Sequence, residues 1–187
     1  MSLFRMSLAG LAMAGLTACA PMMAPPYPSN YAALDQLKKQ PNSKVAVGTF
    51  EPRDPAAPVN KISLRAASMV SPSGSFAQYL EQALISDLRE IAIYDAKAGV
   101  RVDASVKKND IDISGFSEGK GTMEVDLTVR RGETVALKKL YAASIQFPSS
   151  FMGNVAIPRG QSEYGNLVSA LLGKIYGDAD FIAAIKQ

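Results

Sequence analysis

Chemically reactive side chains are scarce in this 187-residue sequence, which contains one cysteine, no histidine and no tryptophan. Histidine is the usual general base near neutral pH and a usual ligand of zinc, so both kinds of chemistry lack their commonest side chain. The single thiol, Cys19, has no second cysteine in the chain with which to close a disulfide. The residues around Cys19 therefore decide what chemistry it can do.

Cys19 follows a segment with the layout of a secretory signal. A short head carries a single charge at Arg5, and an apolar run then extends from residue 6 to residue 16. A membrane-spanning helix needs about 20 apolar residues, so this run is too short to remain as an anchor. Residues 16–19, Leu-Thr-Ala-Cys, resemble a bacterial lipobox, in which the cysteine thiol is linked to diacylglycerol and the signal is cut before it.

The lipobox resemblance implies a signal peptide over residues 1–18 and a mature chain that starts with a lipid-modified Cys19. Several acyl chains anchor a protein stably where one chain is marginal. Ala20 stands where lipoproteins retained in the enterobacterial inner membrane usually carry aspartate, so the resemblance implies the outer membrane, on its periplasmic side. The alternative is an ordinary cleaved signal in which Cys19 is incidental.

The charge of the chain argues against a nucleic-acid partner. The formal net charge is +3, and no run of lysine or arginine is longer than two residues. A nucleic-acid surface is normally a basic stripe with interleaved aromatic side chains, and the chain has only seven phenylalanines and seven tyrosines. We expect no nucleic-acid binding.

Groups that look like motifs have simpler structural explanations. Ser105 and Lys108 are spaced as in an S-x-x-K motif, but that motif works on a helix, and in a strand the two side chains point to opposite sides. Asp110, Asp112 and Glu118 lack the glycine and the distal glutamate of a calcium-binding loop. We therefore expect no enzyme activity, no cofactor and no metal site.

Prolines dominate the sequence that follows Cys19. Residues 20–42 are rich in proline, methionine, alanine, asparagine and serine, a composition that buries little apolar surface and favours extended chain. We interpret residues 19–42 as a tether between membrane and domain, in which a short helical turn is possible over residues 31–39. Residues 43–187 then form a single domain, long enough to bury a core of its own.

The folded part alternates strand-like and helix-like patterns. Ser75 followed by Gln78 marks a helix start, and the apolar spacing after it predicts about four helical turns. A change in the parity of the apolar residues near 108–110 predicts a bulge or bend in a strand. Other expected elements are strands at 44–50, 61–70, 100–106, 122–130 and 134–147, a loop at 148–160, and helices around 164–175 and after Asp178. This order predicts an α+β fold: a mostly antiparallel sheet with two main helices on one face, forming a two-layer sandwich.

The chain resembles a group of uncharacterised proteobacterial outer-membrane lipoproteins in several stretches, among them ISLRAASMVSP at 62–72 and SSFMGNVAIP at 149–158. In its lipobox and element order it is more distantly similar to the YajG-like and ABC-transport-auxiliary lipoproteins. These resemblances imply a place in the cell envelope, and they supply no catalytic residue.

A contact surface is the remaining functional signal. Residues 149–158 are unusually apolar for a connecting loop, so they either tuck under the sheet or form a recognition surface. The candidate contact residues are Arg65, Met69, Asn109, Asp112, Phe151 and Met152. We expect an accessory or docking component of an envelope assembly or transport complex, with an envelope protein as partner. The alternative is a carrier that encloses a lipid or glycan between helices and sheet.

Overall fold

The computed structural model describes residues 21–186, so the expected signal peptide and Cys19 lie outside the described residues. The main sheet contains β2 (Val45–Glu51), β5 (Val100–Asp112), β6 (Glu118–Arg131) and β7 (Thr134–Pro148), in the order β2-β5-β6-β7. β5, β6 and β7 are antiparallel neighbours, while β2 runs parallel to β5. A parallel pair needs a long connection, and here the connection contains a small sheet and a helix.

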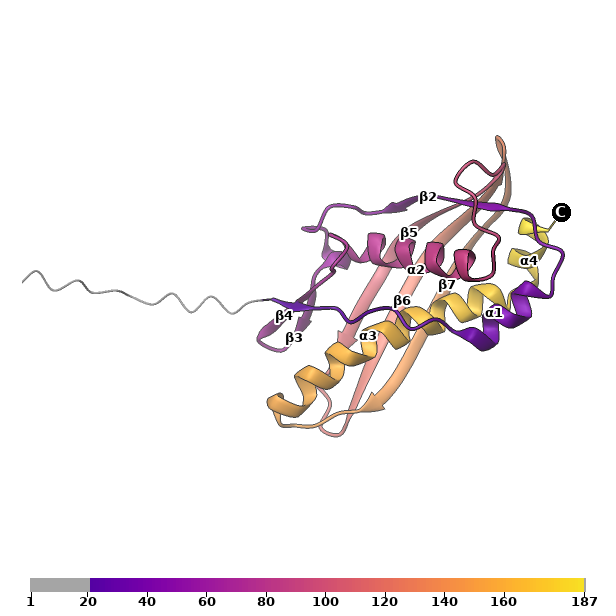
Figure 1. The fold of residues 1–187 in the computed structure, drawn as a ribbon. Helices are drawn as coiled ribbons and strands as arrows, with labels where there is room; N and C mark the ends of the chain where they lie inside the picture. Colours follow the sequence, from indigo (N-terminus) through magenta and orange to yellow (C-terminus); the bar gives the residue numbers. More distant parts are fainter. Residues whose placement is uncertain (1–20, 187) are drawn as a thin grey trace, which may run out of the picture.

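Two long helices, α2 (Phe76–Glu90) and α3 (Gly153–Tyr176), cover one face of this sheet (Figure 1). Alternate side chains of β6 are buried beneath them: Met123, Val125, Leu127 and Val129. The opposite face, which we call the open face, has no described helix over it and carries charged and polar side chains. The prediction of an α+β fold with two main helices on one face is confirmed, and the sheet is mixed because β2 is parallel.

The start of α2 is fixed by two side chains. Ser75 accepts a hydrogen bond from the backbone N–H of Gln78 at 3.1 Å, as the sequence predicted. Asn60, at the end of the short 3-10 helix η1 (Pro58–Asn60), accepts from the backbone N–H of Phe76 at 2.9 Å. The Asn60 amide also donates to two carbonyl oxygens in the loop after β2. Asn60 therefore joins that loop to the first turn of α2.

The predicted irregularity in β5 is confirmed as a bulge. Lys107 is the extra residue between Val106 and Lys108, and it lies one position before the segment 108–110 that the sequence indicated. Beyond the bulge the buried side chains of β5 are on odd-numbered residues, such as Ile111. The bulge thus keeps one face of the strand in the core along its whole length.

A second, smaller sheet corrects the prediction of one strand over residues 61–70. β3 (Ile62–Leu64) and β4 (Ala67–Val70) form a hairpin, and β1 (Met22–Met23) pairs in parallel with β4. The two-residue turn places Arg65 at φ 57°, a left-handed conformation that is uncommon for a residue with a side chain. An arginine followed by an alanine is not a sequence signal for a turn, so the chain reversal between β3 and β4 could not be predicted from the sequence.

The segment after the expected lipidation site does not form a free tether in its described part. Residues 21–30, which we call the strap, run between α2 and α3 on the side of these helices away from the sheet (Figure 1). The Tyr79 hydroxyl donates to the carbonyl of Pro25 at 2.8 Å, and the Gln161 amide donates to the carbonyl of Met23 at 2.7 Å. The strap is extended, as its prolines predicted, but these contacts make it part of the packed domain.

A short helix, α1 (Tyr31–Lys38), continues the strap and matches the helical turn expected at 31–39. Asn30 caps it by accepting from the backbone N–H of Ala33 at 3.1 Å. Leu34 and Leu37 are fully buried in the common core. The domain therefore includes residues 22–42, which the sequence had assigned to the tether.

α3 begins at Gly153, so the connection after β7 is shorter than the predicted loop at 148–160. Pro158 lies inside the helix and removes the donor that the carbonyl of Asn154 would normally have. Asn154 is exposed, so water can replace that donor. The end of α3 matches the prediction: Gly177 is the C-cap, and Asp178 caps a last helix, α4 (Ala179–Ile185).

Candidate functional site

An exposed apolar cluster occupies one end of the molecule. Phe116, in the turn between β5 and β6, stacks on Phe151, in the connection between β7 and α3, with ring centroids 5.7 Å apart. Phe116 is 79% exposed and Phe151 69% exposed. Met152 and Val155, which follow Phe151 by one and four residues, are also at least half exposed. We call these four residues the tip cluster.

Arg65 holds the backbone under the tip cluster in place. Its guanidinium donates to the carbonyl oxygens of Ser150, Phe151 and Ile113 at 2.9, 2.7 and 3.1 Å. The fork of an arginine suits several acceptors at once, so one side chain joins the β3–β4 turn to the loop before α3 and to the end of β5. Arg65 was predicted as a polar contact residue, and its observed contacts are with the domain's own backbone.

The other predicted contact residues divide between this end and the core. Asp112 lines a shallow hollow of about 290 Å³ together with Arg65. Its carboxylate accepts from the backbone N–H of Ser114 at 2.8 Å, and the hydrogen bonds from Ser114 lower the pKa of Asp112. Asp112 therefore stabilises the turn that carries Phe116.

Met69 and Asn109 are not part of an accessible site. Met69 is buried, between Met22 of β1 and Ile62 of β3. Asn109 is buried too, and its amide donates to the carbonyl of Val59 at 3.0 Å. Both residues serve the packing of the domain.

The structure therefore brings Arg65, Asp112, Phe151 and Met152 to one end of the molecule and adds Phe116, which sequence reasoning missed. Phe116 belongs to a stretch rich in glycine, serine and charged residues, between the strands expected at 100–106 and 122–130. A large apolar side chain in a polar turn was the available signal.

Asp87 of α2 is a fully buried carboxylate near the middle of the strap. One of its oxygens, Oδ2, accepts from the hydroxyls of Tyr27 and Tyr176 at 2.6 and 2.8 Å. Burial and the Asp87 carboxylate raise the pKa of both tyrosines, so each hydroxyl remains a donor. This cluster joins the strap to both long helices, and its Asp87 carboxylate and Tyr176 are buried, which indicates a structural role.

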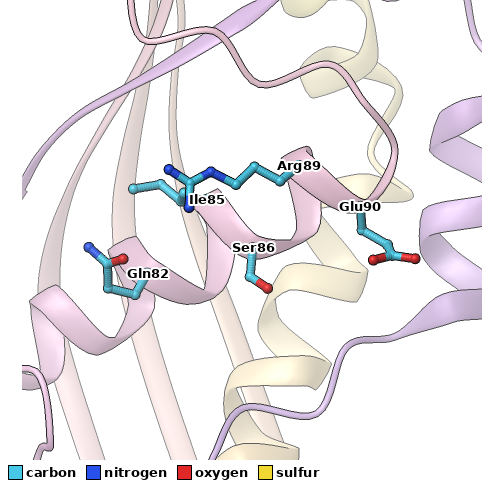
Figure 2. A pocket seen from close by; sticks show the side chains of 5 residues that line it. All are labelled: Gln82, Ile85, Ser86, Arg89 and Glu90. Atoms are coloured by element: carbon cyan, nitrogen blue, oxygen red, sulfur yellow. The ribbon is translucent and has the colours of Figure 1, made fainter.

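The hollows on the described surface are open to solvent and differ in their lining. One of about 400 Å³ beside α2 is lined by Gln82, Ile85, Ser86, Arg89 and Glu90, all from the same helix. Figure 2 shows Arg89 reaching back over Ile85 while Glu90 points away from it, so the polar groups do not converge. A hollow of about 260 Å³ between strap and α2 includes Tyr27 and Tyr79 among its walls.

The open face of the sheet holds a larger hollow, of about 680 Å³. Ion pairs cross its floor: Asp103 contacts Arg101 at 3.1 Å and Arg130 at 3.7 Å, and Lys107 contacts Asp126 at 3.4 Å. Charges of both signs alternate there.

The described range, residues 21–186, contains neither a clustered group of metal-binding side chains nor a helix suited to span a membrane. Within that range no histidine, cysteine or carboxylate residues gather in a group of three that could hold a metal ion. No helix of the same range is both long enough and apolar enough to span a membrane.

No protein-family model matches the chain, and no curated protein matches its sequence. Among solved structures it is similar to protein XCC0632 of Xanthomonas campestris, of family DUF330, with a TM-score of 0.60 and 12% identity over 88% of this chain and 96% of the other. A candidate lipoprotein of Caulobacter crescentus CB15 gives a TM-score of 0.48 at 13% identity, covering 81% and 93% of the two chains. Protein CT253 of Chlamydia trachomatis gives 0.47 at 10%, covering 76% and 99%. None of these three structures tests the more distant similarity to the YajG-like lipoproteins. The chain therefore shares its fold with the Xanthomonas DUF330 protein.

Proposed function

We propose that the chain is a non-enzymatic lipoprotein, anchored through an acylated Cys19 to the periplasmic side of the outer membrane. It serves there as an accessory or docking component of an envelope assembly or transport complex. The observation that carries this proposal is how little chain separates Cys19 from the packed domain. Met22 already pairs with Met69 of β4, and three residues span only about 10 Å when fully extended. A lipid on Cys19 would hold the domain at the bilayer surface.

The short chain between Cys19 and the packed domain favours a docking role over a role as a carrier of lipid or glycan. A lipid or glycan carrier has to move its cargo away from the membrane, and the strap leaves no slack for such movement. Ligand pockets are usually about 300–1,000 Å³ and enclose most of the ligand. The two larger hollows described above, of about 400 and 680 Å³, reach this size but are open to solvent and lined mainly by charged and polar side chains, which weighs against the carrier.

The buried polar side chains support a role without catalysis. Asn60, Asp87 and Asn109 are each engaged in hydrogen bonds that fix one element to another. Buried Glu163 lies in contact with Arg159 and Asn166 of its own helix. Catalytic groups are normally directed into a cleft where substrate can reach them, and these are directed into the scaffold.

We assign the docking surface to the open face, because it is the side of the sheet that helices leave uncovered in the described chain. Its mixed charges suit a polar partner bound at the membrane surface, since transient interfaces are more polar than permanent ones. Lys107 and Asp126 lie near the middle of this face and form one of its ion pairs.

Site-specific photo-crosslinking tests this assignment in intact cells. A crosslinking amino acid replaces Lys107 on the open face, and a matched variant carries it at Gln82, which is exposed on α2. We expect one envelope protein to be captured stoichiometrically at 107 and not at 82. Equal capture at both positions would contradict docking at the open face. Lipid or glycan bound to the purified domain in native mass spectrometry would favour the carrier instead.

A further inference from the structure

The tip cluster is a preformed apolar surface. Large apolar side chains scattered singly on a surface are ordinary, but Phe116, Phe151, Met152 and Val155 come from two segments that meet at the stacked Phe116–Phe151 pair, and all four are at least half exposed. Phe116 and Phe151 come from different connections and stack on each other in water-accessible positions. A group of exposed apolar side chains of this kind marks a surface that contacts a protein or a membrane when the protein functions.

The backbone beneath the tip cluster is held firmly, so its exposure does not come from a frayed loop. Arg65 donates to the carbonyls of Ser150 and Phe151. The hydroxyl of Ser150 accepts from the backbone N–H of Met152 at 3.1 Å, and the backbone N–H of Ser149 donates to the carbonyl of Ser117 at 2.8 Å. The two aromatic rings are therefore presented by a fixed support.

The chain enters the domain at this same end. Figure 1 shows the start of the strap, the β3–β4 hairpin and the beginning of α3 together at one end, while α1, α4 and the C-terminus lie at the other. Met23, at the entry, is 49% exposed, and its carbonyl accepts from Gln161 of α3. Arg65, in the hairpin that pairs with the entering strand, contacts the Phe151 carbonyl directly.

We propose that the tip cluster inserts into the interfacial layer of the bilayer that holds the Cys19 lipid, an inference that rests on the acylation proposed above. Cys19 lies three residues before Met22, so its acyl chains must enter the bilayer within about 10 Å of chain from the pinned β1 strand. The bilayer then faces the end of the domain that carries the tip cluster. Phenylalanine and methionine side chains enter that layer at little cost in free energy, and the apolar area that they bury adds to the membrane affinity supplied by the acyl chains.

Insertion gives the domain one orientation on the membrane. An acyl anchor alone leaves the domain free to tumble about its attachment point. A second contact at Phe116 and Phe151 fixes the tilt. The open face of the sheet then stands at a constant angle to the bilayer, ready for the partner proposed above.

The test uses the acylated full-length protein, purified from cells and reconstituted into vesicles of phosphatidylethanolamine and phosphatidylglycerol. Acylated Cys19 offers no free thiol, so Phe151→Cys introduces the single site that an environment-sensitive fluorophore can label. Met152→Cys provides a second position in the tip cluster. Leu140→Cys is the matched control, because Leu140 is 54% exposed and apolar but lies on β7 outside the cluster.

We expect nitroxide-bearing lipids to quench the labels at 151 and 152 several-fold more than the label at 140. Equal quenching at the three positions would overturn the insertion while leaving the acylation intact, because mass spectrometry of the same samples reports the lipid on Cys19. Absence of that lipid would overturn the proposed function itself. A blue-shifted label at 151 that nitroxide lipids do not quench, and whose shift is lost when the protein is diluted a hundred-fold in lipid, would identify a second copy as the occupant, and it would overturn the inference too.

Discussion

The Tyr27 hydroxyl of the strap donates to Oδ2 of Asp87, a fully buried carboxylate of α2, at 2.6 Å across 60 residues of sequence. Tyr176 of α3 donates to the same oxygen. A hydrogen bond to a buried charge is stronger than one between neutral groups, because the charge has lost its water. The pair therefore fastens the strap to the helices at the middle of its length.

Removal of the Tyr27 hydroxyl tests this attachment. We expect Tyr27→Phe to lower the free energy of unfolding by about 1–3 kcal/mol, since Asp87 keeps only one donor. Urea denaturation of the mature chain with Cys19→Ser measures the loss. Tyr31→Phe is the control, because Tyr31 is 64% exposed. An equal, small effect of both substitutions would show that Tyr27 adds nothing to the attachment.

Gly165 tests whether the strap needs close contact with α3. A Cβ at this position would lie 2.7 Å from Cδ of Pro28 and 3.2 Å from the carbonyl oxygen of Pro26. Alanine would gain about 1 kcal/mol of helix propensity, but a proline ring and a backbone atom cannot move aside cheaply. We therefore expect Gly165→Ala to destabilise the domain and to expose the strap to protease. Gly99→Ala, with open space around its Cβ, is the control, and equal protease resistance of the two variants would contradict the close packing.

Arg65 combines a strained backbone with three hydrogen bonds, and two substitutions separate these effects. Arg65→Ala and Arg65→Gly both lose the bonds to Ser150, Phe151 and Ile113. Only glycine relieves the φ of 57°, a relief worth about 1 kcal/mol. We expect amide exchange at residues 149–153 to rise in both variants, and the glycine variant to be the more stable in urea. Greater stability of the alanine variant would show that the turn is unstrained.

The lowered pKa of Asp178 predicts how the stability of the domain changes in acid. Burial raises the pKa of Asp178, but hydrogen bonds from Lys139 and Tyr141 outweigh that effect and the pKa is lowered. As pH falls, the unfolded chain therefore takes up its proton first. The stabilisation is complete above the ordinary aspartate pKa of about 3.9 and is lost as pH falls through the lower folded value.

The substitution Asp178→Asn isolates this charge, because asparagine can still cap α4. We expect the variant to lose less stability than the wild type between pH 5 and acid conditions, about pH 2, in urea titrations spanning the aspartate range. Asp35→Asn, exposed on α1, serves as the control. Identical acid dependence of wild type and Asp178→Asn would contradict the assignment.

Local patterns predicted much of this fold. The Ser75 cap, the stripe of α2, the alternation along β6 and the parity shift in β5 depend on neighbouring residues, which a sequence displays directly. The β3–β4 reversal, by contrast, depends on Arg65 adopting a left-handed conformation that its hydrogen bonds to distant carbonyls hold in place. No pattern within residues 61–70 reports those bonds.

The position of the strap could not be predicted from the sequence for the same reason. Its prolines predicted extended chain, and the structure confirms that, but its position depends on Tyr79, Asp87 and Gly165, which are far away in the sequence. At the candidate site, the apolar character of residues 149–158 left open whether Phe151 and Met152 tuck under the sheet or form a surface, and the structure shows both side chains exposed. The contribution of Phe116 became visible only when the fold placed its ring on that of Phe151.

Palmitate labelling in cells shows whether lipid on Cys19 holds this packed domain against a bilayer. Cells expressing the wild type or Cys19→Ser are grown with labelled palmitate, and their membranes are separated by density. We expect label on the wild type in the outer-membrane fraction, and an unlabelled variant released from that fraction. An unlabelled wild type, or a variant that stays in the membrane fraction, would contradict anchoring through Cys19.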